Sequence, residues 1–172
     1  MTMSQSDFLA LFQANSAISE LSEHIKSNTK RVSLKNTAGS SVAVAAALTV
    51  TNGIHLFLLS DREEAAYFYN DLVYLLDEES VLFFPSSFKR SIQFGNPDPS
   101  GIIQRTKVVS QTKILQKQKG TQPKLLIVSY PEALVEKVPD LVQMDKNTMV
   151  LSSGEKLSLS FTVEVIQEYG FQ

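Results

Sequence analysis

The spacing of hydrophobic residues predicts two helices at the start of the chain. Between residues 8 and 25, apolar side chains recur at intervals of three and four, as they do on one face of a helix. Asn15 and Ser16 interrupt this run, and their polar side chains are suited to capping a second helix. A polar link at residues 26–30 leads to a short run at 31–34, which we expect to form the first strand.

Beyond residue 35 the pattern alternates between helical and strand-like segments. The continuous apolar run at 54–59 predicts a strand that is buried on both faces. Residues 60–63 have the composition of a capping box, which predicts a helix behind them. The other expected elements are helices at 39–48, 102–117 and 131–137 and strands at 81–84 and 124–129. Strands that alternate with helices predict an α/β fold with a parallel sheet and right-handed crossovers.

The last part of the chain gives weaker signals. Residues 148–151 are expected to form a strand. Residues 159–169 fit helical spacing, although β-branched residues within them favour a strand, and we expect a helix. Because the chain stops soon after this pattern, we expect it to be a piece cut from a larger polypeptide.

Composition excludes several classes of protein. Of 172 residues, 43% are hydrophobic and 20% charged, which is typical of a globular domain. A net charge of −2 argues against a generic nucleic-acid binder. The absence of cysteine excludes disulfides, zinc–thiolate clusters and thiol nucleophiles. The longest apolar-rich stretch, 42–50, is too short to span a membrane, so we expect a soluble, cytoplasmic protein.

A loop at residues 34–41 occupies the place of a phosphate-binding loop, between an expected strand and a helix. A functional loop has a glycine, four residues, a second glycine, a lysine and then serine or threonine. Here Gly39 and Ser41 fit that pattern, but Leu34 replaces the first glycine and Ser40 replaces the lysine. Without an ammonium group near the β- and γ-phosphates, nucleotide hydrolysis is not expected. The loop is therefore interpreted as degenerate, and its residues are Thr37, Ala38, Gly39, Ser40 and Ser41.

Several segments, taken in order, resemble the N-terminal region of the bacterial transcription-repair coupling factors. They are the loop at 36–41, the strand and cap at 56–61, residues 82–85, the helix start at 102–105, and the segment 126–134. The resemblance extends from about residue 32 to the end of the chain, and its specificity lies in the order and spacing of these segments. This region of the family is similar to the first domain of the excision-repair protein UvrB.

The resemblance implies a P-loop NTPase-like fold of the RecA type, a three-layer α/β domain that has lost its ATPase residues. We expect an N-terminal helical segment at 1–30, the UvrB-like domain at 31–138, and the truncated beginning of a smaller α+β inserted domain, which docks UvrA, at 139–172. In the family, this module recruits UvrA and keeps the translocase autoinhibited. ATP and Mg²⁺ are implied only for the motor domains of the parent, an ATP-dependent DNA translocase. Those domains and the module that binds RNA polymerase lie outside this chain.

Two departures from the family limit what the resemblance implies. UvrB carries a long aromatic hairpin that inserts into DNA, whereas this chain has only a loop at 85–101, with Phe88 and Phe94. The UvrA-facing surface of the family lies largely around an arginine–glycine element that would follow residue 172. We therefore expect UvrA binding by this chain to be weak or lost, and we assign no residue to that contact.

A few side chains are candidates for contacts with nucleic acid or protein partners. Lys89 and Arg90 lie between two aromatic residues in the loop at 85–101, and Arg105 and Lys107 belong to a stretch rich in basic residues. A solvated loop and a helix whose cations scatter around its axis explain the same residues. His24 and His55 have no partner at metal-ligand spacing and are expected to be structural.

Together these observations predict a non-catalytic interaction module with no cofactor or metal of its own. Two alternatives remain open. The loop at 34–41 could bind a nucleotide in an unorthodox way, or the loop at 85–101 and the basic helix could bind single-stranded nucleic acid.

Overall fold

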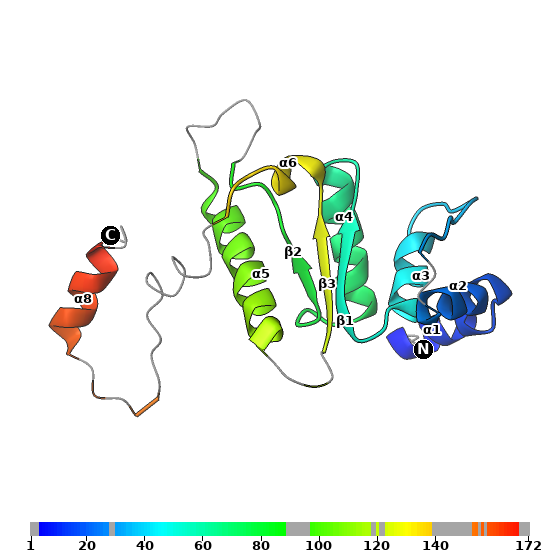
Figure 1. Cartoon of the computed structure of the whole chain (residues 1–172), viewed down its shortest axis with the longest axis horizontal. Helices are drawn as coiled ribbons and strands as arrows, with labels where there is room; N and C mark the ends of the chain where they lie inside the picture. Colours follow the sequence, from blue (N-terminus) through cyan, green and yellow to red (C-terminus); the bar gives the residue numbers. More distant parts are fainter. Residues whose placement is uncertain are drawn as a thin grey trace. The chain divides into compact units, whose positions relative to one another are not determined.

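The computed structural model describes residues 4–27, 30–88, 97–117, 120, 123–138, 153–154, 156 and 158–168. The chain divides into two compact units, Met1–Glu136 and Lys137–Gln172. The first unit is an α/β domain with a small parallel sheet and several helices (Figure 1). Its elements are α1 (Gln5–Gln13), α2 (Ser16–Lys26), α3 (Ser41–Thr49), β1 (Gly53–Leu58), α4 (Arg62–Leu75), β2 (Val81–Phe83), α5 (Pro99–Lys117), β3 (Lys124–Ser129) and α6 (Pro131–Leu134).

The three strands are parallel and lie in the order β1-β3-β2. The chain therefore passes from β1 over β3 to β2 through α4, and returns to β3 through α5. Because parallel crossovers are right-handed, these opposite directions place α4 and α5 on opposite faces of the sheet. Leu126 and Val128 pack with the α3–α4 layer, whereas Leu125 and Ile127 pack with α5.

Short polar side chains fix where the helices begin. The Asn15 side chain accepts a hydrogen bond of 2.9 Å from the amide of Ala17 and separates α1 from α2. The Asp61 side chain accepts one of 2.9 Å from the amide of Glu64 at the start of α4. These contacts satisfy amides that have no partner within the helix. The helix boundary predicted at Asn15 is confirmed, and a helix does follow residues 60–63, with Asp61 as its cap.

The strand predicted at 31–34 is wrong for this structure. Residues 31–35 are not part of a helix or strand, and the sheet begins with β1. Other boundaries shift by smaller amounts. α5 begins at Pro99, three residues before the predicted start, and α6 ends at Leu134, short of the predicted 137.

The prediction that residues 54–59 are buried on both faces is also wrong. β1 does form there, but the side chains of Ile54, Leu56 and Leu58 are 42%, 57% and 54% exposed. β1 lies at the edge of the sheet, and α5 packs against β2 at the other edge (Figure 1). Within the described residues, the face of β1 on the α5 side is therefore left uncovered.

In the second unit the structure describes one helix, α8 (Leu159–Glu168). The helix predicted at 159–169 is confirmed over that range. The strand predicted at 148–151 lies outside the described residues. Across the described parts of both units, no helix combines the length and the hydropathy of a membrane-spanning segment.

Candidate functional site

The carboxyl ends of β2 and β3 open onto a buried polar cluster. In α/β proteins with parallel sheets, ligands bind at this edge, in the loops that follow the strands. Here the edge is formed by residues 84–88 after β2, residues 97–101 at the start of α5, and residues 129–136 after β3.

Arg105 is the centre of the cluster. Its side chain comes from α5 and is buried, and its Nη1 donates to the carbonyl oxygens of Pro85 at 2.8 Å and Ala133 at 2.9 Å. Nη2 donates to the carbonyl oxygen of Glu136 at 3.2 Å. The guanidinium carbon also lies 4.2 Å from the centre of the Phe84 ring, within cation–π range. One side chain thus ties α5 to the segments that follow β2 and β3.

The carboxylate of Glu136 binds the segment after β2. It accepts hydrogen bonds from the Ser87 amide at 2.8 Å, the Ser87 hydroxyl at 2.6 Å and the Ser86 hydroxyl. It also lies 3.7 Å from Nη1 of Arg105. The Ser86 amide donates to the Tyr130 hydroxyl at 2.8 Å. The chain therefore uses its own acceptors to hold the backbone and hydroxyl groups of the segment after β2.

A second ion pair closes the base of the loop at 85–101. Phe88 and Pro97 form an antiparallel bridge, and the amide of Asp98 donates to the carbonyl of Ser87 at 2.8 Å. Nη2 of Arg62, on α4, lies 3.3 Å from Oδ2 of the buried Asp98 carboxylate. These contacts join the two ends of the loop to each other and to α4.

Ionisation of Glu136 stabilises this arrangement. Burial disfavours its charge, but hydrogen bonds from Ser86 and Ser87 together with Arg105 outweigh that effect and hold its pKa below the usual value. The pKa of Asp98 is also lowered, first by the Ser100 hydroxyl and then by Arg62. In both cases the folded form has the lower pKa.

The stability of the domain should therefore fall in acid. A carboxyl whose folded pKa is depressed contributes stability above its unfolded pKa and loses it as the pH falls through the folded value. Urea unfolding followed from about pH 6 to about pH 3 should show a steep decline. In Glu136→Gln, stability should be lower at neutral pH and the decline shallower. An unchanged slope in that variant would contradict the role of Glu136.

The loop before α3 is a turn that is closed by a hydrogen bond of its own. No strand leads into it among the described residues, and its turn uses left-handed backbone at Asn36 (φ 59°) and Gly39 (φ 51°). The Ser41 hydroxyl accepts a hydrogen bond of 3.0 Å from the amide of Ala38, so it is engaged within the loop. Ser40 is the N-cap residue of α3 but makes no side-chain capping bond.

The last residue of β3 is a serine that bonds to the neighbouring chain segment. An ATPase would place an acidic residue for Mg²⁺ at the end of such a strand. Here Ser129 is fully buried, and its hydroxyl donates to the carbonyl of Phe84 at 2.8 Å, which joins β3 to the segment after β2. In the described parts of the chain, no group of three or more histidine and acidic residues is placed to hold a metal ion.

The structure separates the four basic candidates. Arg105 was predicted as a candidate for contact with a partner or nucleic acid. The structure contradicts this prediction, because the guanidinium is buried and donates hydrogen bonds to three carbonyl oxygens. Lys107 is exposed on α5 and remains a candidate. Lys89 and Arg90 lie outside the described residues.

Arg105, Tyr130 and Glu136 come together only in the folded domain. The sequence analysis missed this cluster because 25 residues separate Arg105 from Tyr130 and 6 separate Tyr130 from Glu136.

Each histidine contacts a residue four positions away in the sequence. Nε2 of His24 lies 3.7 Å from the Glu20 carboxylate one turn away, and Nε2 of His55 lies 2.9 Å from the carbonyl oxygen of Thr51. Both contacts are local, and no metal-ligating group of residues includes either ring among the residues described.

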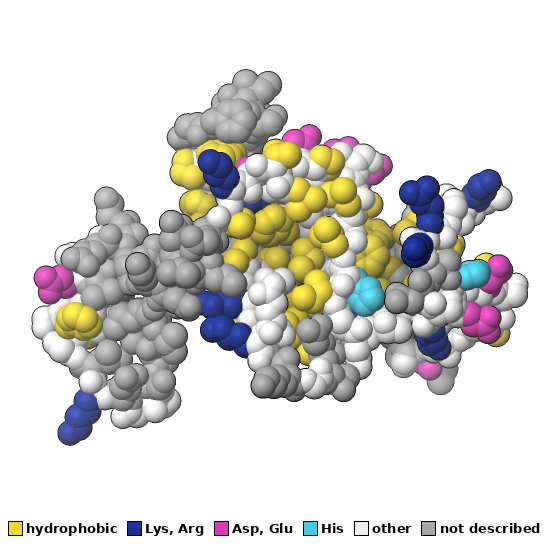
Figure 2. All heavy atoms as spheres, in the orientation of Figure 1, with side chains coloured by type: hydrophobic (Ala, Val, Ile, Leu, Met, Phe, Trp, Pro, Cys, Tyr) yellow, Lys and Arg dark blue, Asp and Glu magenta, His cyan; other side chains and the backbone are white. Residues whose placement is uncertain are grey.

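Among the described residues, β1 has a row of apolar side chains that are about half exposed. Ile54, Leu56 and Leu58 point to one face of β1, and Figure 2 shows hydrophobic side chains gathered over the sheet on the face in view. No lysine, arginine, aspartate or glutamate interrupts residues 53–59. Natural sheets seldom leave an apolar face beside a strand edge open to water.

Comparison with protein-family models, with curated proteins and with solved structures finds no match to this chain.

Proposed function

We propose that this chain is a non-catalytic interaction module, related to the N-terminal region of the transcription-repair coupling factors. The parallel sheet with helices on both faces would be a reduced RecA-type, P-loop NTPase-like domain. Residues 139–172 would begin the inserted domain that docks UvrA. The parent protein would supply ATP hydrolysis, DNA translocation and RNA polymerase binding through other domains, in the cytoplasm.

The single observation that carries the docking role is the uncovered row Ile54, Leu56 and Leu58. These three side chains on one face of β1 are 42–57% exposed. A partner that covers them would remove apolar surface from water, which is energetically favourable. Candidates for that partner are UvrA and sibling domains of the parent protein, because the resemblance implies both.

The absence of catalysis is supported by the two sites that an ATPase would use. The loop before α3 has serine in place of lysine at position 40, and the carboxyl edge of β2 and β3 is filled by the bonds of Arg105, Glu136 and Ser129. Neither arrangement offers a cation to a triphosphate in an open cavity.

Binding of purified UvrA to the immobilised chain tests the docking role. We expect weak, saturable binding, with a Kd in the range of about 10–100 μM, because much of the family's contact surface lies elsewhere. Leu56→Asp should weaken it at least about tenfold by placing a charge in the apolar row. Ile103→Asp, at a side chain on α5 that is 68% exposed, is the matched control and should have little effect.

Three results would count against this proposal. UvrA binding that is equal in Leu56→Asp and the parent chain would remove the docking role from β1. Micromolar binding of Mg-ATP in a calorimetric titration would favour the nucleotide-binding alternative. A salt-dependent fluorescence shift with single-stranded DNA would favour the nucleic-acid alternative.

A further inference from the structure

The outer surface of α4 carries two exposed aromatic rings. Tyr67 and Tyr74 are 66% and 68% exposed, whereas the opposite side of the same helix packs in the domain core through Ala65, Phe68 and Leu72. The two tyrosines are seven residues apart, which is about two helical turns, so both rings lie on one side of the helix. Tyrosine is enriched at protein interfaces, and this side of α4 is therefore a candidate contact surface.

Acidic side chains lie on the same stripe as the two rings. At 3.6 residues per turn, four side chains fall within about 80° of one another around the helix axis: Glu63, Tyr67, Asp71 and Tyr74. Glu63 is exposed and Asp71 is half-buried. The stripe from residue 63 to residue 74 is about 16 Å long. Carboxylates and aromatic rings thus alternate along three turns of the helix.

A pocket lies at the C-terminal end of this stripe, between α1, α3 and α4. Its volume is about 280 Å³, and Phe8, Val44 and Leu75 give it apolar walls. Asp71 and Tyr74 also line it, so the stripe leads into the pocket. The volume is below the range of about 300–1,000 Å³ that is usual for sites of drug-sized ligands, and it suits a single long side chain.

The charges around this pocket favour a cation. The three helices that form it carry four acidic residues and one basic residue, which are Asp7, Glu63, Glu64 and Asp71 against Arg62. Arg62 is at the other end of α4, and its Nη2 lies 3.3 Å from the Asp98 carboxylate. At the start of α1, the capping box of Ser4 and Asp7 bonds the amides of both residues. A cationic side chain would therefore be attracted to the pocket, and an anion would be repelled.

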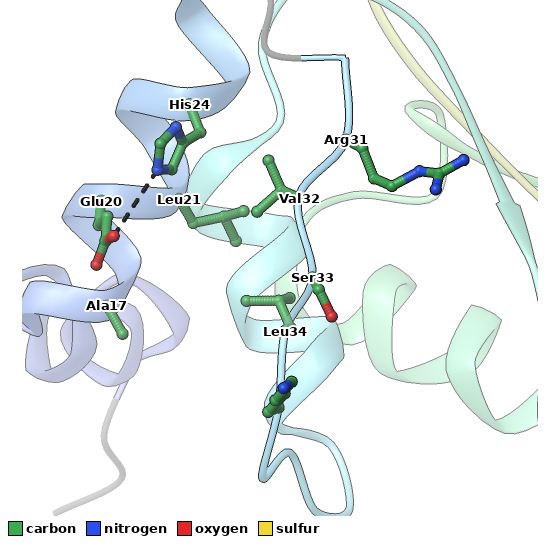
Figure 3. A pocket seen from close by; sticks show the side chains of 9 residues that line it. Ala17, Glu20, Leu21, His24, Arg31, Val32, Ser33 and Leu34 are labelled. Atoms are coloured by element: carbon green, nitrogen blue, oxygen red, sulfur yellow. Dashed lines mark ion pairs between the residues drawn. The ribbon is translucent and has the colours of Figure 1, made fainter.

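A larger pocket between α2 and residues 31–35 shows no such preference. Its volume is about 440 Å³, and its charged side chains have both signs, Glu20 against Arg31 and Lys35. Figure 3 shows Glu20 paired with His24 and the Arg31 side chain directed away from α2. The larger pocket selects neither sign of charge, which distinguishes it from the pocket on α4.

We propose that the outer surface of α4, with the pocket at its end, binds a basic segment of a partner protein. One arginine of that segment would enter the pocket, where Phe8 and Val44 cover its methylene groups. Its guanidinium would pair with the Asp71 carboxylate and stack on the Tyr74 ring. A second basic side chain of the segment would lie over Tyr67.

Arginine on a peptide backbone suits this surface better than a small amine does. A planar guanidinium can bond a carboxylate through two N–H groups and stack on an aromatic ring at the same time. The stripe is long enough for two basic side chains that are held on one backbone. The surface lies on the opposite face of the sheet from the apolar row of β1, so this inference goes beyond the proposed function and does not depend on it.

A labelled peptide tests the proposal. The probe has arginine at every fourth position among alanines, and the control peptide has glutamate at the same positions. Fluorescence anisotropy at low salt should give a Kd of about 10–100 μM for the arginine peptide and no binding for the glutamate peptide. In NMR spectra, the amides of Asp71 and Tyr74 should shift during the titration, and those of Leu56 and Leu58 should not.

Substitutions separate this site from a general attraction between charges. Asp71→Asn and Tyr74→Ala should each weaken binding at least about fivefold, because each removes one contact to the guanidinium. Tyr74→Phe keeps the ring and should bind like the parent chain. Glu23→Gln is the matched control, because it removes an exposed carboxylate on α2 that does not line the pocket, and its affinity should be unchanged.

Four outcomes would overturn the proposal. The first is no detectable binding of the arginine peptide at about 1 mM. The second is equal affinity in Asp71→Asn and the parent chain, and Tyr74→Ala, at an exposed ring, gives an independent answer if Asp71→Asn fails to fold. The third is an equal loss in Glu23→Gln and Asp71→Asn, which would show that net charge alone attracts the peptide. The fourth is binding of spermine as tight as that of the peptide, which would assign the surface to a polyamine.

Discussion

Arg105→Met should destabilise the first unit by about 3–5 kcal/mol, the range found when one partner of a buried ion pair is removed. Three carbonyl oxygens, those of Pro85, Ala133 and Glu136, would lose their donor, and the Glu136 carboxylate would lose its nearby positive charge. The methionine side chain fills most of the space but donates no hydrogen bond. Urea unfolding at neutral pH, followed by circular dichroism, measures the change.

Two variants on the same helix calibrate this result. Lys107→Met removes an exposed cation from α5 and should change the free energy of unfolding by less than about 0.5 kcal/mol. Arg105→Lys keeps the charge but cannot reach three acceptors in a fixed fork, so its effect should fall between the other two. If Arg105→Met and Lys107→Met have equal small effects, the buried cluster does not hold the domain together.

Gly101→Ala should also destabilise the domain, by about 1–3 kcal/mol, although glycine to alanine in a helix is normally favourable. A Cβ atom added at Gly101 would lie 2.5 Å from the carbonyl oxygen of Ser86, closer than side-chain carbons come in real structures. Because the obstacle is backbone, α5 must move away from the segment after β2. Thermal unfolding of the variant gives the sign directly.

Thr106→Ala is the control for the helix itself. Thr106 is exposed on α5, and its replacement should stabilise the helix by a few tenths of a kcal/mol, as propensity predicts. Gly101→Ala that behaves like Thr106→Ala would show that the close approach to Ser86 relaxes at no cost.

Local signals in the sequence were enough to predict most of the elements. Asn15 and Asp61 cap helices through contacts that span two or three residues, so the pattern and the chemistry agree within a short window. The segment 124–129, with four apolar residues at its centre, forms a strand that is buried along nearly its whole length, because it lies in the middle of the sheet.

The errors arose where the outcome depends on distant neighbours. The run at 54–59 looks like a central strand, but its exposure is set by which elements lie beside it, and β1 lies at an edge. Residues 31–34 have strand-like composition but lack a partner in this structure.

The polar cluster could not be predicted from spacing. Arg105 lies 20 residues from Pro85 and 31 from Glu136, so no local pattern joins them. One chemical signal was present in the sequence. Arg105 lies on the same helix as the apolar residues Val108 and Leu115, and an arginine among apolar positions suggests burial with a partner. By contrast, Ser40 in place of lysine was visible directly in the sequence.

Glu136 is the last residue of the first unit, and its position has a mechanical consequence. A pull on the chain from residue 137 onward would first load the bonds of its carboxylate to Ser86 and Ser87 and of its carbonyl to Arg105. Because these bonds reach both the segment after β2 and α5, the force would be shared between the two. Several hydrogen bonds of Glu136 would have to break together before α6 could separate from the domain. The junction would therefore act as a tether that resists tension.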